Sequence, residues 1–298
     1  MENKWAISRI MPFRLRKRKP TTRSLYGSVV SFLFLGFLGA FMLLPLIYAV
    51  SNAFKPLDEL FLFPPNFFVR KPTGQNFSTL WMIMSNSWVP FSRYLFNSVF
   101  YTAAGTAGHV IIASVGAYVL AKHKFPGRNL FFAIIIASLM FTPQVTNIPN
   151  YLVMTFLHWI DSPLAIIVPA WGYSLGLFLM KQFIEQMIPD PIIESARIEG
   201  ASELRIVFSI IMPMVKPAWL TLIILSVQAM WNNPSSTFIL SEQYKTLPYA
   251  LSQILEGGFV RMGVGAAVSV FIMALPITLF IFTQSRIVDT MAASGIKE

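Results

Sequence analysis

The chain has 298 residues, of which 55% are hydrophobic and 12% are charged, and its formal net charge is +10. This composition is too apolar for one ordinary soluble core, so membrane-spanning segments are expected. Cysteine is absent, which excludes disulfides, thiolate metal ligands and cysteine nucleophiles in this chain.

Six long stretches without Asp, Glu, Lys or Arg each reach the roughly 20 residues that a helix needs to cross a bilayer. They do not alternate every second residue, which argues against a β-barrel, and a helix satisfies its own backbone groups in lipid. The sequence therefore predicts an all-α polytopic membrane protein with six transmembrane helices. The stretches are 24–54, 94–121, 129–160, 162–180, 217–241 and 262–285.

Basic residues set the expected orientation. With a cytoplasmic amino terminus, the cytoplasmic segments hold 17 Lys and Arg and the outside loops hold six, so both termini are expected in the cytoplasm. We expect a basic cytoplasmic segment at 1–25, a six-helix membrane domain at 26–286 and a cytoplasmic tail at 287–298. The first stretch is too long for the apolar core of a cleaved signal peptide. The basic run 14–20 abuts it and is interpreted as a lipid-binding flank rather than a nucleic-acid site.

Five charges fall within residues 194–205, between the fourth and fifth stretches. Together they would cost about 12 to 17 kcal/mol at a bilayer centre, so they lie outside the hydrocarbon. Prolines at 189 and 191 and Asp190 favour a helix start, and Gly200 interrupts the helical pattern. The segment predicts helix, glycine turn and helix along the membrane surface. A plain amphipathic connector would have the same composition.

The spacing in this segment resembles the EAA loop of importer-type ABC transporter permeases. Ser195 stands where that family usually has Ala, and Met212 stands where Leu is common. Other stretches, among them the Trp231 and Asn232 pair and the ending TMAASGIKE, look like the carbohydrate-uptake branch, in particular the second permease subunit of maltose-type importers. Essentially the whole chain is covered. The residues that carry the loop pattern are Glu194, Ser195, Ala196, Gly200, Ile210, Met212 and Pro213.

The resemblance implies a type I importer permease, not an enzyme, that moves a sugar into the cell by alternating access, with an oligosaccharide expected. In that family the EAA loop, here about 189–213, docks on a separate ATPase subunit. Glu194 is then expected to make a polar contact, Ser195 and Ala196 to allow close packing, and Gly200 to form the turn. The ATPase-coupling residues so implied are Glu194, Ser195, Ala196, Gly200, Ala201 and Pro213.

The resemblance also implies partners and a location. These are a second homologous permease in a heterodimer, two cytoplasmic ATPase subunits, an extracellular solute-binding protein, an oligosaccharide and the lipid of the bacterial cytoplasmic membrane. The chain lacks the G-x-x-x-x-G-K-[ST] phosphate loop, so ATP and Mg²⁺ are expected in the partner ATPase and no cofactor in this chain. No nucleic acid is expected.

Candidates for the sugar path are amide and aromatic side chains at membrane depth, because sugars need hydrogen-bonding groups and flat faces. The same residue types also anchor helices at the membrane interface or join helices, so each of them has a structural alternative. The candidates are Gln144, Asn147, Asn150, Tyr151, Trp171, Tyr173, Gln228, Trp231, Asn232 and Asn233.

Two other classes stay open from the residues alone. Residues 172–176 match G-x-S-x-G, so an intramembrane serine protease using Ser174 and His109 is one, although an apolar run is not the context of a nucleophile elbow. A secondary transporter or channel is the other, and it would place ionisable residues within its spans. His109 is the ionisable residue in mid-span and is interpreted as a hydrogen-bonded packing residue. Three scattered histidines predict no metal site.

Overall fold

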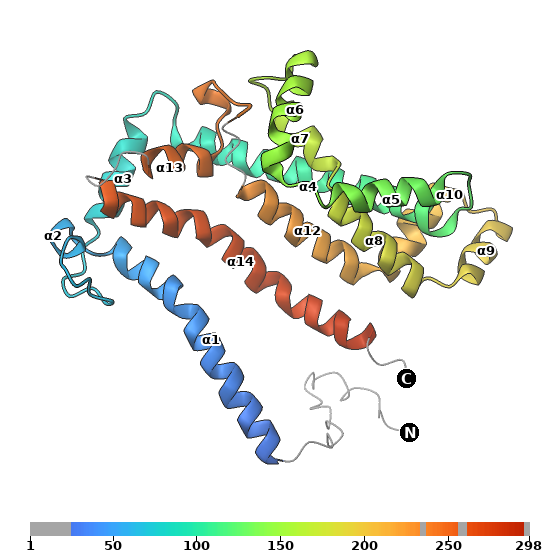
Figure 1. Cartoon of the computed structure of the whole chain (residues 1–298), viewed down its shortest axis with the longest axis horizontal. Helices are drawn as coiled ribbons and strands as arrows, with labels where there is room; N and C mark the ends of the chain where they lie inside the picture. The colour runs from blue at the N-terminus through green and yellow to red at the C-terminus, as the bar shows by residue number, and fades with distance from the viewer. Residues whose placement is uncertain (1–24, 233–236, 256–260, 295–298) are drawn as a thin grey trace, which may run out of the picture. The chain divides into compact units, whose positions relative to one another are not determined.

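The computed structural model describes residues 25–232, 237–255 and 261–294. Within these residues all regular elements are helices, as the composition and periodicity predict (Figure 1). The elements are α1 Leu25–Ala53, α2 Leu57–Leu60, α3 Gln75–Ser85, α4 Phe91–Lys122, α5 Arg128–Ser138, α6 Pro143–Phe156, α7 Leu164–Trp171, α8 Ser174–Met187, α9 Asp190–Ile198, α10 Glu203–Arg205, the π-helix η1 Ile206–Ile211, α11 Met212–Met214, α12 Lys216–Trp231, the 3₁₀-helix η2 Glu242–Tyr244, α13 Leu247–Leu255 and α14 Met262–Ser294.

The chain divides into two compact units, residues 1–47 and 48–298. The described part of the first unit is most of α1, an apolar helix with Pro45 inside it. The second unit contains the last turn of α1 and all the other helices. At its carboxyl end α14 continues to Ser294, so the helix extends beyond residue 286, where the sequence places the end of the membrane domain.

Within the part of the chain that the structure describes, four helical segments are long and apolar enough to cross a membrane by length and composition, and they overlap four of the six predicted stretches. A fifth is obtained if the segment Glu203–Met214 and α12, which are bent by 88°, count together as one span. The count of six stays a prediction. The four segments are Tyr26–Ala53, Phe91–Lys122, Leu164–Met187 and Met262–Phe282.

The predicted stretch 129–160 is not one helix. It is divided into α5 and α6, of 11 and 14 residues, with a break at residues 139–142. Pro143 starts α6, and Thr142 before it is extended, with ψ 152°. A residue that precedes proline is driven out of the helical region by the proline ring, which explains the break. Each half is shorter than the roughly 20 residues of a straight span.

Helix α4 is the central element of the second unit and packs against α7, α8 and α12 (Figure 1). Two glycines allow the closest approach. A Cβ on Gly108 of α4 would lie 2.0 Å from the indole Nε1 of Trp171, and a Cβ on Gly176 of α8 would lie 2.1 Å from Nε2 of His109. Each glycine therefore leaves space for a ring from a neighbouring helix: Trp171 of α7 packs over Gly108, and His109 of α4 packs over Gly176.

Candidate functional site

A pocket of about 360 Å³ lies where α7 ends and α8 begins. Residues of α4, α8 and α12, together with the connection at Tyr173, form its wall. None of the lining residues is Asp, Glu, Lys or Arg, so the wall combines apolar side chains with neutral polar groups. The lining residues are His109, Tyr173, Leu175, Gly176, Leu222, Leu225, Ser226, Gln228, Ala229 and Asn232.

His109 joins three of these elements at the wall of the pocket. Its Nε2 lies 3.2 Å from the carbonyl oxygen of Tyr173, and its Nδ1 lies 2.5 Å from Oγ of Ser226. A carbonyl oxygen only accepts, so Nε2 donates, and in the neutral ring Nδ1 accepts the hydroxyl hydrogen of Ser226. His109 is 3% exposed and both nitrogens have partners. This is the hydrogen-bonded packing role that the sequence indicates.

The structure does not bring together the pair that a serine protease would need. Ser174 Oγ accepts a hydrogen bond of 2.6 Å from Ser138 of α5, while His109 gives its ring nitrogens to Ser226 and Tyr173. Ser174 also begins a helix that follows another helix, whereas a nucleophile elbow follows a strand. The protease interpretation of residues 172–176 is therefore rejected.

Three of the sugar-path candidates, Tyr173, Gln228 and Asn232, meet in the pocket. Two others pack inside the chain: the indole nitrogen of Trp171 donates to the carbonyl of Ala104 at 3.2 Å, and that of Trp231 donates to the carbonyl of Ile272 at 2.8 Å. The remaining described candidates are exposed on α6 and do not line the pocket; these are Gln144, Asn147, Asn150 and Tyr151. Asn233 lies outside the described residues.

Sequence reasoning missed Ser226 and the leucines of the pocket wall. A serine in the apolar α12 has many structural uses, so by itself it gives no signal. The available signal was His109, because a buried imidazole needs two hydrogen-bond partners and a hydroxyl in a neighbouring helix supplies one.

The predicted coupling segment forms helix, turn and helix as expected. Helix α9 begins after Pro189, and α10 begins after Ser202, whose side chain accepts a hydrogen bond from the amide of Arg205. Between them Gly200 has φ +78°, a conformation that side chains with a Cβ rarely adopt. A Cβ on Gly200 would meet nothing within 4 Å, so the backbone conformation, not crowding, explains glycine at this position.

The coupling candidates divide between an exposed and a buried face of α9. Glu194, Ser195 and Gly200 are exposed. Ala196 is 6% exposed and lies in the chain's own hydrophobic core together with Ile193, so this small side chain packs against the interior of the chain, and its close packing with an ATPase stays a prediction. Three candidates lie outside α9: Gly200 forms the turn, Ala201 is half-buried after it, and Pro213 is exposed in α11.

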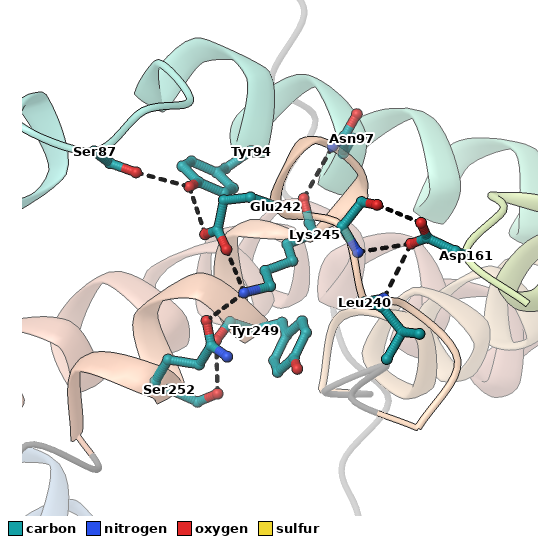
Figure 2. Close-up of polar contacts among 11 residues, drawn as sticks. Ser87, Tyr94, Asn97, Asp161, Leu240, Glu242, Lys245, Tyr249 and Ser252 are labelled. Carbon is teal, nitrogen blue, oxygen red and sulfur yellow. Dashed lines mark hydrogen bonds and ion pairs between the residues drawn. The ribbon is translucent and has the colours of Figure 1, made fainter.

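A separate polar network fixes residues 238–247, here called loop 238–247, to the Phe91 end of α4 (Figure 2). Asn97 Nδ2 donates to the carbonyls of Gln243 and Lys245 at 2.8 and 2.9 Å. The hydroxyl of Tyr94 donates to a carboxylate oxygen of Glu242 at 2.7 Å, and that carboxylate also pairs with Lys245. Both Asn97 and Tyr94 are buried, so the loop is held by interior groups of α4.

Asp161, between α6 and α7, holds the same loop from another side (Figure 2). Its carboxylate accepts hydrogen bonds from the amides of Leu240 and Ser241, at 3.0 and 2.7 Å, and from the Ser241 hydroxyl. Burial opposes the charged form of Asp161, but these three hydrogen bonds outweigh it and lower its pKa. Loop 238–247 is thus fixed to α4 and to the α6–α7 connection.

Residues 110–292 match the family described as "binding-protein-dependent transport system inner membrane component". This match covers more than half of the chain, and the chain therefore belongs to that family. Both the pocket wall contributed by α8 and α12 and the whole coupling segment lie within the matched residues. Members are permease subunits, so the chain is a multi-pass transport subunit of the inner membrane and not an enzyme.

Named relatives and one solved structure agree with this assignment. The arabinooligosaccharides transport system permease protein AraQ of Bacillus subtilis (strain 168) is 28% identical over 267 residues, which are 89% of this chain and 94% of AraQ. Protein LplC of the same organism is 33% identical over 210 residues, 69% of this chain and 67% of LplC. A chain in the crystal structure of a bacterial ABC transporter involved in the import of the acidic polysaccharide alginate shares the fold, with a TM-score of 0.72 at 22% sequence identity. The superposition covers 90% of this chain and 99% of the alginate transporter chain.

Proposed function

We propose that this chain is a permease subunit of an ATP-driven ABC importer that moves a sugar, with an oligosaccharide expected, across the bacterial cytoplasmic membrane. The observation that carries the proposal is the likeness over 89% of the chain to a permease named for arabinooligosaccharides. The charge distribution supports six spans with both termini in the cytoplasm, because the segments that would then be cytoplasmic hold 17 of the 23 Lys and Arg.

The family description, with its reference to a binding protein, supports a solute-binding protein as one partner. A second homologous permease and two ATPase subunits that bind ATP and Mg²⁺ complete the proposed complex. The surface of α6 fits a partner permease in the membrane: Val145, Ile148 and Leu152 are exposed apolar side chains at helical spacing. An isolated chain would leave that surface to lipid.

The pocket is proposed as part of the sugar path. Gln228 and Asn232 offer amide donors and acceptors for sugar hydroxyls, and the ring of Tyr173 offers a face for the apolar side of a pyranose or furanose. Gln144, Asn147 and Tyr151 follow one another at i, i+3 and i+7 on α6, so they form a polar stripe that would complete the path only against the partner permease.

The α9–α10 segment is proposed as the contact with the ATPase. Glu194 and Ser195 are exposed for polar contact, and Ile198 on the same helix is an apolar side chain that is 87% exposed. Ile198 is thus available for apolar contact with a docked ATPase. ATP-driven movement would then reach the spans through α9.

The test is isolation of the complex from its native membrane in mild detergent, followed by mass spectrometry and an assay of ATP-dependent uptake. Wild type should bring an ATPase and a second permease with it. Gly200→Ile should insert normally but separate ATP hydrolysis from uptake, because a β-branched residue is strained at φ +78°. Gly200→Asn is the matched control, since Asn tolerates this conformation.

Two outcomes would contradict the proposal. One is recovery of the chain alone, from wild type and mutant alike. The other is uptake that follows a proton gradient without ATP, which would favour a secondary transporter; in that case His109→Gln should abolish the flux, whereas ATP-driven uptake should largely survive this change.

A further inference from the structure

Four side chains from three elements meet at the Lys122 end of α4, and we call them the Glu203 cluster: Tyr118, His123, Arg197 and Glu203. Arg197 Nε donates to one oxygen of Glu203 at 2.8 Å. The Tyr118 hydroxyl donates to the other oxygen at 2.5 Å and accepts a bond from Arg197 Nη2 at 3.1 Å. The ring Nε2 of His123 lies 3.2 Å from Arg197 Nη2. The carboxylate thus joins α4 to both sides of the coupling turn.

Gly200 explains why the turn needs such a link. Backbone hydrogen bonds close the turn itself, from the amide of Ala201 to the carbonyl of Ala196 and from the amide of Gly200 to that of Arg197, both at 3.0 Å. No side chain supports it at Gly200, because nothing lies within 4 Å of the position where a Cβ would be. Arg197 closes α9 and Glu203 opens α10, so their ion pair bridges the turn from side to side. The pair therefore adds a side-chain link between α9 and α10 to the backbone bonds of the turn.

Tyr118 connects the bridged turn to the interior. Its ring is 2% exposed and lies in the core with Ile193 and Ala196 of α9, while its hydroxyl reaches Glu203. From Tyr118, α4 runs without a break to His109 at the pocket wall, nine residues or about 14 Å away. One continuous helix therefore joins the cluster to the pocket.

We propose that Tyr118, through Glu203 and Arg197, is a positioning residue that fixes α9 to α4, so that a displacement imposed on α9 is delivered to α4 and to the pocket instead of being absorbed at Gly200. This inference rests on the proposed function, because it takes the ATPase as the source of the displacement. It assigns a role to a hydroxyl and an ion pair that contact neither the sugar nor ATP.

The first test measures distance. Because the chain has no cysteine, Glu199→Cys and Phe100→Cys introduce two unique spin labels, at the end of α9 and on the far part of α4, both at exposed positions. In a complete transporter with cysteine-free partners, the distance between the labels should stay narrowly distributed when ATP binds. Tyr118→Phe, which removes one oxygen, should broaden the distribution or shift it on ATP binding. An unchanged distribution in Tyr118→Phe would overturn the proposal.

The second test measures coupling with arabinotriose as the probe in proteoliposomes that contain the complete transporter and its binding protein. Tyr118→Phe and Glu203→Gln should each raise the number of ATP molecules hydrolysed per sugar imported by roughly threefold. The swap of Arg197→Glu with Glu203→Arg should restore the ratio in part, because the ion pair is rebuilt. Lys124→Gln is the matched control, an exposed charge next to His123 that lies outside the cluster and outside the α9–α10 segment, and it should leave the ratio unchanged.

The outcomes separate this inference from the proposed function. A wild-type complex without an ATPase would contradict the proposed function, and the label distance in the isolated chain would still show whether Tyr118 fixes α9 to α4. If Tyr118→Phe does not assemble, Glu203→Gln carries the test, since the amide oxygen still accepts from Tyr118 while the ion pair is lost. Normal coupling in Glu203→Gln, with the ATPase bound, would overturn the inference alone.

Discussion

At its Phe91 end, α4 is held by buried side chains that bind the main chain of loop 238–247, whereas at its Lys122 end an ion pair whose charged groups are open to water adds to the apolar contacts with α9 and α10. Asn97 is 2% exposed and bonds two carbonyls of the loop. The side chains of Arg197 and Glu203 are 39% and 50% exposed. A buried carbonyl that loses its donor has no substitute, while an exposed ion pair exchanges readily with water. The Phe91 end is therefore the more strongly fixed end, and the exposed ion pair at the Lys122 end contributes to the position of α9 more than to stability.

The largest expected effect is at the fixed end. Asn97→Ala removes two donors. The carbonyl of Gln243 keeps Arg93 Nε at 3.3 Å, but the carbonyl of Lys245 loses its donor, so the free energy of unfolding should fall by about 2 kcal/mol. Thermal or denaturant unfolding in detergent measures it. Asn129→Ala, at an exposed position in the first turn of α5, is the control and should change stability by no more than about 0.5 kcal/mol. Equal effects of the two variants would remove the contrast between buried and exposed contacts.

A smaller loss of stability is expected at acid pH, also at the Phe91 end of α4. Burial raises the pKa of Glu242, but donation from Lys245 and Tyr94 outweighs burial and lowers the pKa below the usual 4.5. The stabilisation by this carboxylate is therefore complete above pH 4.5 and is lost as the pH falls through the lower folded value. Hydrogen exchange of loop 238–247 should accelerate in that acid range, and Glu242→Gln should remove this part of the pH dependence. Acceleration that is the same in wild type and Glu242→Gln would assign the effect to another group.

The smallest stability effect is expected at the Lys122 end. Arg197→Gln breaks an exposed ion pair, so the free energy of unfolding should change by less than about 1 kcal/mol. The same variant should nevertheless alter the ATP-to-sugar ratio in the complete transporter. A loss of stability as large as that of Asn97→Ala would mean that the Glu203 cluster is as fixed as the other end.

The sequence predicts the long helices well because their signal is simple. A run of apolar residues between charged flanks predicts the bounds of α1 and α4 to within a few residues. The predicted stretches are 24–54 and 94–121, and the observed helices are Leu25–Ala53 and Phe91–Lys122. The same signal cannot detect a break inside an apolar run. The separation of α7 from α8 at Gly172 and of α5 from α6 before Pro143 depends on backbone conformation, to which hydropathy is insensitive.

The site was predicted in part for the same reason. Tyr173, Gln228 and Asn232 were selected by residue type, but residue type did not distinguish them from Trp171 and Trp231, which the fold uses for packing. Pairings across long sequence separations had no local signal. The bond between Tyr118 and Glu203, and that between Asp161 and Ser241, follow only from how the helices are placed.

The right angle before α12 has a mechanical consequence. The segment Glu203–Met214 meets α12 at 88°, and the indole nitrogen of Trp219 donates to the carbonyl of Met212 at 3.0 Å, which braces the corner around the fully buried Val215. If the two helical segments move as one rigid body, they form a right-angled lever with arms of about 17 and 24 Å. A displacement of about 3 Å at the Glu203 end, perpendicular to the short segment, would rotate both segments by about 10°. The far end of α12 would then move by about 4 Å, close to the rise of three helical residues. Gln228 and Asn232 lie at that far end, so a small movement that begins beside Glu203 would change the width of the pocket.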